Sequence, residues 1–260
     1  MENHFVKTSK LMIEADVKEG KTVLKDVYFT APFKIMNPFY MNKDYMTVMC
    51  MSSSAGIMAG DVQEYHLKVK EGAKLEFVSQ EYEKIHKMNE GFATRATEIS
   101  VAKNGLLLYN PQPTIPFKNS AFKSKVNVHL EDDTSTFVMK EIISAGRVSR
   151  GELFEYQYYH NLVNVYRKDT LIYRDNTRFE PTLMDLSSMG LFEHYTHMGT
   201  LLLFSTGHTK EWLHDARNLI EETPDIDGGV TTLNETAIVI RVLGFQADKL
   251  EKLMDKILMM

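Results

Sequence analysis

The sequence contains a single cysteine, Cys50, among its 260 residues. One thiol cannot close an intrachain disulfide or supply a CxxC metal knuckle, so a disulfide framework and a cysteine zinc site are excluded. No apolar run approaches the roughly 18 residues that a membrane-spanning helix needs. The opening residues Met1–Lys10 hold no apolar segment of signal-peptide length. These absences predict a cytoplasmic protein without a membrane partner.

Several catalytic signatures are also missing. The sequence has no G-x-x-x-x-G-K-[ST], no G-x-G-x-x-G, no H-E-x-x-H and no G-x-S-x-G. It therefore gives no support to an ATPase, a dinucleotide enzyme, a zinc protease of the H-E-x-x-H type or an α/β-hydrolase. A net charge of −5 and the lack of any basic run argue against a nucleic-acid partner.

Most of the chain alternates between extended segments and tight turns. Leu11–Val17 alternates apolar with polar residues, Lys18–Lys21 turns the chain, and Thr22–Phe29 is extended again, which predicts a β-hairpin. Asn104-Gly105 lies between two further extended segments. Because Asn-Gly is the strongest short signal for a hairpin turn, a second hairpin is predicted there.

Turn centres recur near Gly72, Gly105, Asp132 and Lys168, about thirty residues apart. This spacing is typical of stacked β-repeats, although the repeats share little sequence. We therefore predict a mainly β fold with a superhelical or stacked antiparallel β-sheet architecture.

Two helices are expected near the end of the chain. Lys210–Glu222 carries apolar residues at helical spacing, with Thr209 as its N-cap, and Ala247–Met260 repeats the pattern. We predict one domain over residues 1–260, with a β-rich body at 1–200 and a portion of mixed helix and strand at 201–260.

The segment Ser53–Asp61 interrupts the strand pattern with small residues and ends on a carboxylate. Two glycines, two serines and two alanines allow crowded or left-handed backbone conformations there. We expect this segment to bring Asp61 to a place where other polar groups converge. The alternative is a flexible turn.

Charged residues also fall within or beside apolar strands. The clearest are Lys84, Glu141, Arg147, Glu152 and Asp175. A buried charge is costly unless it is paired or lines water, so several of them on core-type strands imply a polar interior or channel. The alternative is a set of ion pairs at strand ends that face solvent.

His194 and His197 could ligate one metal ion because they lie three residues apart, the spacing of one helical turn. No third ligand is close in the sequence. Ordinary surface or packing histidines are the competing interpretation.

Four segments together resemble the urease accessory protein UreD/UreH family, with the UreH branch the nearer. They are Ser54–Asp61, Glu83–His86, Pro111–Phe117 and Ala145–Glu152. Their order and spacing also agree with the family, and the resemblance covers the whole chain. Ala59 stands where the family often has glycine.

The resemblance implies a non-enzymatic role in the maturation of nickel urease. Such proteins bind a helical accessory protein (UreF-like), which recruits a nickel-carrying GTPase (UreG-like), and the assembly docks on apo-urease. The implied fold is a β-superhelix with two helices. No cofactor is expected to be bound tightly, but Ni²⁺ would pass transiently through a polar tunnel.

Carried over position by position, the resemblance makes Asp61, Lys84, Glu141 and Asp175 candidate tunnel residues. Arg147 and Lys84 would hold carboxylates in position by charge-assisted hydrogen bonds. Glu152, next to Arg147, is grouped with them.

Two other classes of function remain open from the residues alone. One is a β-solenoid or sandwich enzyme acting on a polysaccharide, with Asp61 and Glu141 as acid and base. It would require carboxyl groups about 5–9 Å apart and a long groove lined by aromatic residues. The other is a plain binding module whose polar residues merely pair with one another.

Overall fold

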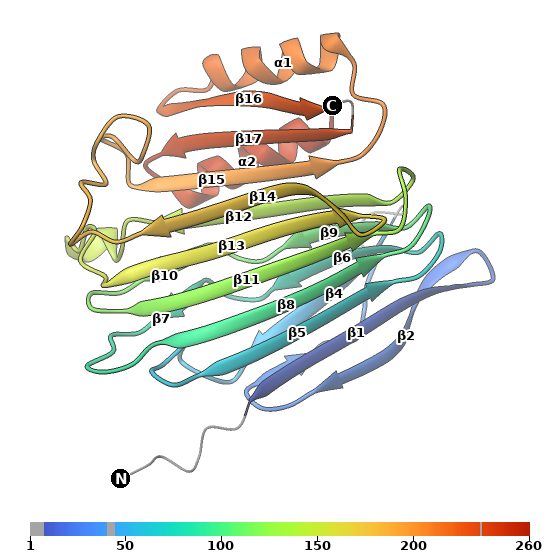
Figure 1. Cartoon of the computed structure of the whole chain (residues 1–260), viewed down its shortest axis with the longest axis horizontal. Coiled ribbons are helices and arrows are strands. Elements are labelled where there is room, and N and C mark those ends of the chain that lie inside the picture. Colours follow the sequence, from blue (N-terminus) through green and yellow to red (C-terminus); the bar gives the residue numbers. More distant parts are fainter. Residues whose placement is uncertain (1–7, 41–44, 235) are drawn as a thin grey trace.

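Two β-sheets packed face to face form the body of the protein. The computed structural model describes residues 8–40, 45–234 and 236–260 (Figure 1). The seven-stranded sheet contains, in spatial order, β14 (Thr170–Phe179), β13 (Tyr158–Arg167), β11 (Ala121–Leu130), β8 (Ala93–Val101), β5 (Val62–Val69), β1 (Ser9–Lys18) and β2 (Lys21–Phe29).

The second sheet has ten strands. Its main path runs through β16 (Ile226–Asn234), β17 (Ala237–Gly244), β15 (His197–Phe204), β12 (Thr136–Ser144), β9 (Leu106–Asn110), β6 (Lys74–Ser79), β4 (Met46–Ser52) and β3 (Phe33–Ile35). Two short strands, β7 (Glu83–Ile85) and β10 (Thr114–Pro116), join it at one end, where β10 pairs with β12 and with β7.

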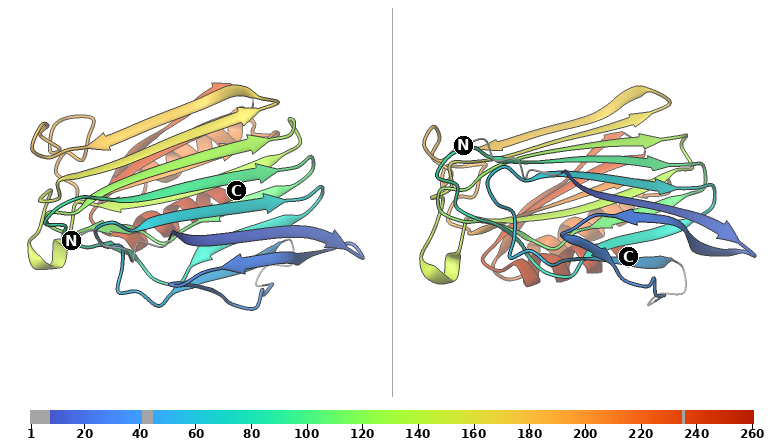
Figure 2. Two further views of the ribbon diagram at one scale, coloured as in Figure 1. Left: turned by 60° about the horizontal axis from the view of Figure 1, so that its bottom comes forward. Right: turned by 90° about the horizontal axis from the view of Figure 1, so that it is seen from below.

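The chain coils from one sheet to the other. The turn at Gly72 carries it from β5 into β6, the turn at Gly105 from β8 into β9, and the turn after Leu130 from β11 into β12. Each return places the next strand beside its predecessor and in the same direction. As a result β5, β8, β11 and β13 are parallel neighbours, and so are β4, β6, β9 and β12 (Figure 2).

This coiling explains where the sequence prediction of strand pairing succeeds and where it fails. The mainly β class and the two late helices are confirmed, and so are the hairpins β1–β2 and β13–β14. The hairpin predicted at Asn104-Gly105 is wrong, because that turn links two different sheets. The predicted antiparallel stacking therefore holds only toward the sheet edges, and the central strand pairs are parallel.

A short third side closes one end of the coil. The bridge between Ile57 and Ile85, the β7–β10 pair and the bridge between Thr114 and Ile143 form a row of parallel contacts there. The segment Pro111–Phe117 supplies β10.

Alternating side chains fill the space between the sheets. In β8, for example, Ala93, Arg95, Thr97, Ile99 and Val101 are all buried while the residues between them face outward. Aromatic rings from four strands pack in a row, with centroids 5.2 Å apart for Phe33 and Tyr65 and 5.5 Å apart for Phe77 and Tyr109. Such pairs add to the stabilisation from burial itself.

Both helices lie on the outer side of the ten-stranded sheet (Figure 1). α1 (Lys210–Glu221) begins at the predicted N-cap, where the Trp212 amide donates to Thr209 Oγ1 at 3.1 Å, and it packs on β16. α2 (Ala247–Leu258) packs on β12, β15 and β17. Within the part of the chain that the structure covers, neither helix is long and apolar enough to span a membrane.

Truncating Leu250 should weaken the packing of α2 on the sheet. Its side chain is fully buried against the glycines of β15 and β17, so Leu250→Ala leaves a cavity there. We expect the free energy of unfolding, measured by urea denaturation, to fall by about 2–5 kcal/mol. Lys252→Ala, on the exposed side of the same helix, should change it by less than about 0.5 kcal/mol. Equal losses would contradict the docked arrangement of α2.

Candidate functional site

A buried arginine lies at the centre of a polar region between the two sheets. Arg95 occupies a core-facing position of β8, and only 8% of the residue is exposed. A guanidinium in such a place must find hydrogen-bond acceptors on all sides, because an unpaired buried charge is strongly destabilising.

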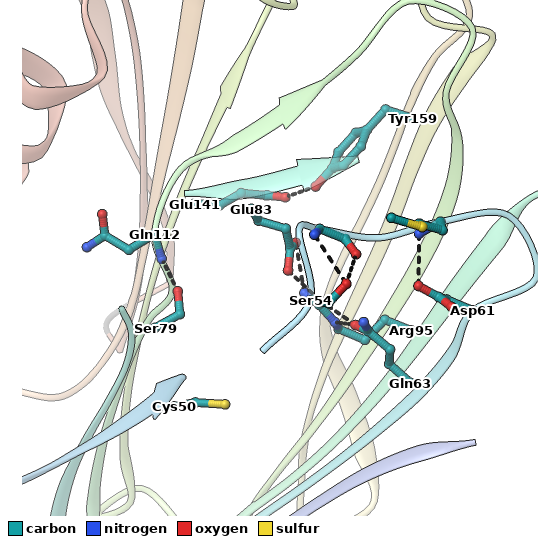
Figure 3. Close-up of polar contacts among 12 residues, drawn as sticks. Cys50, Ser54, Asp61, Gln63, Ser79, Glu83, Arg95, Gln112, Glu141 and Tyr159 are labelled. Atoms are coloured by element: carbon teal, nitrogen blue, oxygen red, sulfur yellow. Dashed lines mark hydrogen bonds and ion pairs between the residues drawn. The ribbon is translucent and has the colours of Figure 1, made fainter. Parts of the chain in front are cut away.

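Two neighbouring side chains supply those acceptors (Figure 3). Both terminal nitrogens of Arg95 donate to the Glu83 carboxylate, Nη1 at 2.9 Å, and Nε and Nη2 donate to Gln63 Oε1 at 2.9 and 2.6 Å. The Tyr65 ring lies 4.8 Å from the guanidinium carbon. Burial by itself lowers the pKa of Arg95, but the charge of Glu83 and its hydrogen bonds raise it above its usual value. The side chain is therefore a permanent cation.

A second carboxylate between the sheets, Glu141, is half-buried and lies on β12. Tyr159 Oη and Asn161 Nδ2 donate to its Oε1 atom at 2.7 and 2.8 Å. Burial raises the pKa of the Glu141 carboxyl, the negative charge of Asp175 raises it further, and the two hydrogen bonds oppose the change. Asn161 Oδ1 is also buried and has no hydrogen-bond partner among the described residues.

Two small cavities meet at the arginine. One, of about 70 Å³, reaches from Cys50 and Ser54 to Glu83 and Arg95. The other, of about 30 Å³, reaches from Glu83 and Arg95 to Glu141. The walls of both cavities mix polar with apolar side chains and leave room for water. The Glu83–Arg95 pair is thus the wall that the two cavities share.

Asp175 extends the polar region to the edge of the sandwich. Across neighbouring strands, Glu141 lies opposite Thr200, and Thr200 lies opposite Arg241. Arg241 in turn donates to Asp175 on β14, whose other oxygen accepts from Thr177 Oγ1 at 2.9 Å. This ion pair joins the two sheets beside Glu141, so the structure brings two of the predicted residues, Glu141 and Asp175, close together.

Asp61 has a different position. Its carboxylate accepts from the Met58 amide at 2.8 Å and so fixes the loop to which it belongs. The loop lies tightly against β7, because a Cβ on Gly56 would come within 2.4 Å of Lys84 O. Ser54 and Gly56 line the larger cavity, whereas Asp61 faces away from it (Figure 3).

The remaining predicted residues lie around the same end of the coil. Lys84 borders the larger cavity, but its ammonium group pairs with Glu81 at the surface. Arg147 binds both oxygens of Glu152 and lies 4.3 Å from the Phe117 ring.

A chain of contacts connects the Arg147 pair to the loop. Phe117 packs on His86, with ring centroids 4.9 Å apart, and His86 Nε2 lies 3.0 Å from Ala55 O. These residues therefore surround the loop that borders the larger cavity. Glu141 lies further inside the protein, and Asp175 lies at the opposite edge of the sandwich.

The geometry does not favour the alternative of a polysaccharide enzyme. Glu141 opens only to the cavity of about 30 Å³, whereas ligand pockets typically measure about 300–1,000 Å³. Asp61 serves its own loop and lines neither cavity. A sugar ring cannot reach both carboxylates.

The histidine pair does not form a helical metal site. His194 packs on Tyr195 and Phe245, while His197 begins β15 with Nδ1 2.9 Å from Thr196 Oγ1. Burial lowers the pKa of His197. Across residues 8–40, 45–234 and 236–260, no three or more His, Cys, Asp or Glu side chains are arranged to hold a metal ion.

Sequence reasoning missed the residues at the centre of this region, namely Gln63, Glu83, Arg95, Tyr159 and Asn161. The signal was present in the alternation of the strands. Arg95 and Asn161 occupy the same phase as the apolar core residues of β8 and β13. A polar residue in that phase must face the interior.

Removing the buried guanidinium should be costly because it leaves the half-buried Glu83 carboxylate without its cation. We expect Arg95→Met to lower the free energy of unfolding by about 3–5 kcal/mol. The double variant Arg95→Met with Glu83→Gln removes both charges and should lose less than Arg95→Met alone. Urea denaturation measures both. A double variant that loses as much stability as Arg95→Met alone, or more, would contradict the pairing.

The raised pKa of Glu141 gives a pH-dependent prediction. The folded state holds the proton more tightly than the unfolded chain, so stability falls as the pH rises from 4.5 through the raised pKa. Glu141→Gln removes this ionisation and keeps an oxygen for Tyr159 and Asn161. The stability of the variant relative to the native protein should therefore increase with pH across that window. Parallel stability curves of the two proteins would contradict the assignment.

Comparison with known proteins gives a consistent result. The family model described as UreD urease accessory protein matches residues 7–260. A urease accessory protein UreD from Acetivibrio thermocellus is 37% identical over 98% of this chain and 97% of its own length. A UreH from Helicobacter pylori strain P12 is 36% identical over 98% of this chain and 95% of its own length.

The match extends to a third bacterial relative, a UreD from Lachnoclostridium phytofermentans, at 33% identity over 95% of this chain. The family consists of accessory proteins rather than enzymes, which confirms the non-enzymatic prediction. Since both the family model and these relatives cover nearly the whole sequence, the chain belongs to the UreD family of urease accessory proteins.

Proposed function

We propose that this protein is a cytoplasmic scaffold and metallochaperone for urease, and that Ni²⁺ passes through its polar interior. It would dock on apo-urease and on a helical, UreF-like accessory protein, through which a nickel-carrying, UreG-like GTPase joins. The observation that carries the proposal is the row of polar groups between the sheets. That row runs from the Ser54 cavity past Glu83 and Arg95 to Glu141 and Asp175.

The chemistry of this row suits an ion in transit. Carboxylate, amide and hydroxyl oxygens can replace part of the hydration shell of a divalent cation. Stations with few ligands release the ion again, as conduction requires. Glu141 with Asn161 Oδ1, which has no partner among the described residues, would form one such station.

The Glu83–Arg95 pair sets a condition on this route. A guanidinium repels a cation, but the bidentate carboxylate neutralises it, so the wall between the two cavities carries no net charge. An ion crossing from one cavity to the other would have to displace this pair. Arg147, Glu152, Lys84 and Asp61 would keep the loop at the larger cavity in shape.

Nickel delivery should fall when the inner carboxylates lose their charge. We expect Glu141→Gln combined with Asp175→Asn to lower the rate of urease activation about tenfold, which corresponds to a barrier about 1.4 kcal/mol higher. Co-purification of the variant with apo-urease and accessory proteins should be unchanged. Nickel content per urease, measured by elemental analysis, and urease activity in cells are the readouts.

The matched control for these variants is Glu64→Gln, which removes a carboxylate on the outer face of the seven-stranded sheet. It should leave nickel content unchanged. Asp61→Ala tests the loop separately and should lower nickel content while leaving assembly intact. Full nickel loading of urease in the presence of the Glu141/Asp175 double variant would overturn the interior route. If the native protein does not co-purify with apo-urease and the accessory proteins, the scaffold role is overturned.

A further inference from the structure

The outer face of the seven-stranded sheet is not covered by either helix, since α1 and α2 pack on the other sheet (Figures 1 and 2). Three adjacent rows cross β11, β13 and β14 on this face. They are Lys123–His160–Arg178, Lys125–Leu162–Asn176 and Asn127–Asn164–Arg174. We call these nine residues the basic face.

Charge is distributed unevenly over this surface. The basic face carries four exposed cations and no carboxylate, in a protein whose net charge is −5. Arg178 pairs with Glu180, just beyond the end of β14. Arg174 donates to the amide of Asn164, and among the described residues neither Arg174 nor Lys125 forms an ion pair with a carboxylate.

The other half of the same sheet neutralises itself. On β1 and β5, Lys10 pairs with Glu64 at 3.2 Å and Lys68 pairs with Glu14 at 3.5 Å. Lys25, from β2, also reaches Glu14, at 3.1 Å. The same fold thus pairs its surface charges on one half, whereas on the other half Arg178 alone of the four cations pairs with a carboxylate among the described residues. Charged residues scattered evenly over a solvent-exposed face would not divide in this way into a paired half and a largely unpaired half.

Aromatic side chains accompany the cations at one end of the basic face. The Lys123 ammonium lies 4.3 Å from the centroid of Phe92, whose side chain is 43% exposed. The same ammonium and Arg178 both lie within 6 Å of the Tyr158 ring centroid. Arginine and aromatic residues are enriched at protein interfaces, where they act as rigid anchors.

We propose that the basic face is a docking surface for a folded protein that presents a patch of Asp and Glu side chains. The uncovered cations supply the electrostatic complement, and Phe92 and Tyr158 supply the apolar contact. Such a surface steers an acidic partner and fixes its orientation. The negative net charge of the whole chain opposes binding to nucleic acid, whose phosphates would be repelled by the rest of the surface.

The test uses two probes, apo-urease and the helical accessory protein. This choice of probes rests on the proposed function. Purified apo-urease and the purified helical accessory protein are each titrated with the full chain by biolayer interferometry at low and high salt. The variant Lys125→Glu with Arg174→Glu reverses two cations that pack on no aromatic ring. We expect it to weaken binding of at least one probe about tenfold or more at low salt, with the loss reduced at high salt.

Lys18→Glu with Lys21→Glu is the matched control. These exposed lysines face each other at the β1–β2 turn, and the change in net charge is the same. The control should bind as the native protein does, and circular dichroism should show native folding for both variants. The conservative pair Lys125→Arg and Arg174→Lys should retain binding.

Three outcomes would overturn the proposal. If the native chain binds either probe and the charge reversal binds equally well, the basic face is not the docking surface, while the proposed function stands. If the native chain binds neither probe, the scaffold role fails and the docking surface with it. A third arm uses a 30-base-pair DNA duplex, and charge-dependent binding to DNA alone would also overturn the proposal.

Discussion

The fold depends on the requirement that a guanidinium buried between two sheets be neutralised. Arg95 meets that requirement with Glu83 from the short third side of the coil and Gln63 from the adjacent strand. The contact fixes the register of β8 against β5 and holds β7 against the body. Polar groups elsewhere in the interior follow the same rule, since Glu141 is held by Tyr159 and Asn161. The interior is therefore a packed apolar core with one polar end.

Much of the fold could be predicted from the sequence because its local signals are strong. The alternation in β1 and the N-cap of α1 place those elements within one or two residues. Strand pairing could not be predicted in the same way. The turn at Asn104-Gly105 has hairpin chemistry, yet its two strands belong to different sheets, and only long-range packing decides between these outcomes. Local chemistry fixes where the chain turns and leaves open which strand becomes the neighbour.

The candidate site shows the same division. Glu141 can be identified because a carboxylate inside an apolar strand is conspicuous in a sequence, and the structure places it half-buried between the sheets. Arg95 was overlooked because β8 contains several polar residues, so that its core-facing phase is visible only when the strand bounds are known. The small-residue loop was recognised correctly as a special conformation, but the role of its carboxylate was not. Asp61 orders the loop from within, and Ser54 and Gly56 face the cavity.

The coiled path of the chain has a consequence for how proteins of this architecture can change size. One circuit adds a strand to each sheet, and neighbouring strands lie about 4.8 Å apart. Gain or loss of a circuit would move the loop end and the β14 edge apart or together by that increment, without altering either end. The length of the interior would then change in discrete steps. The surfaces at the loop end and at the β14 edge could change in sequence independently of that length.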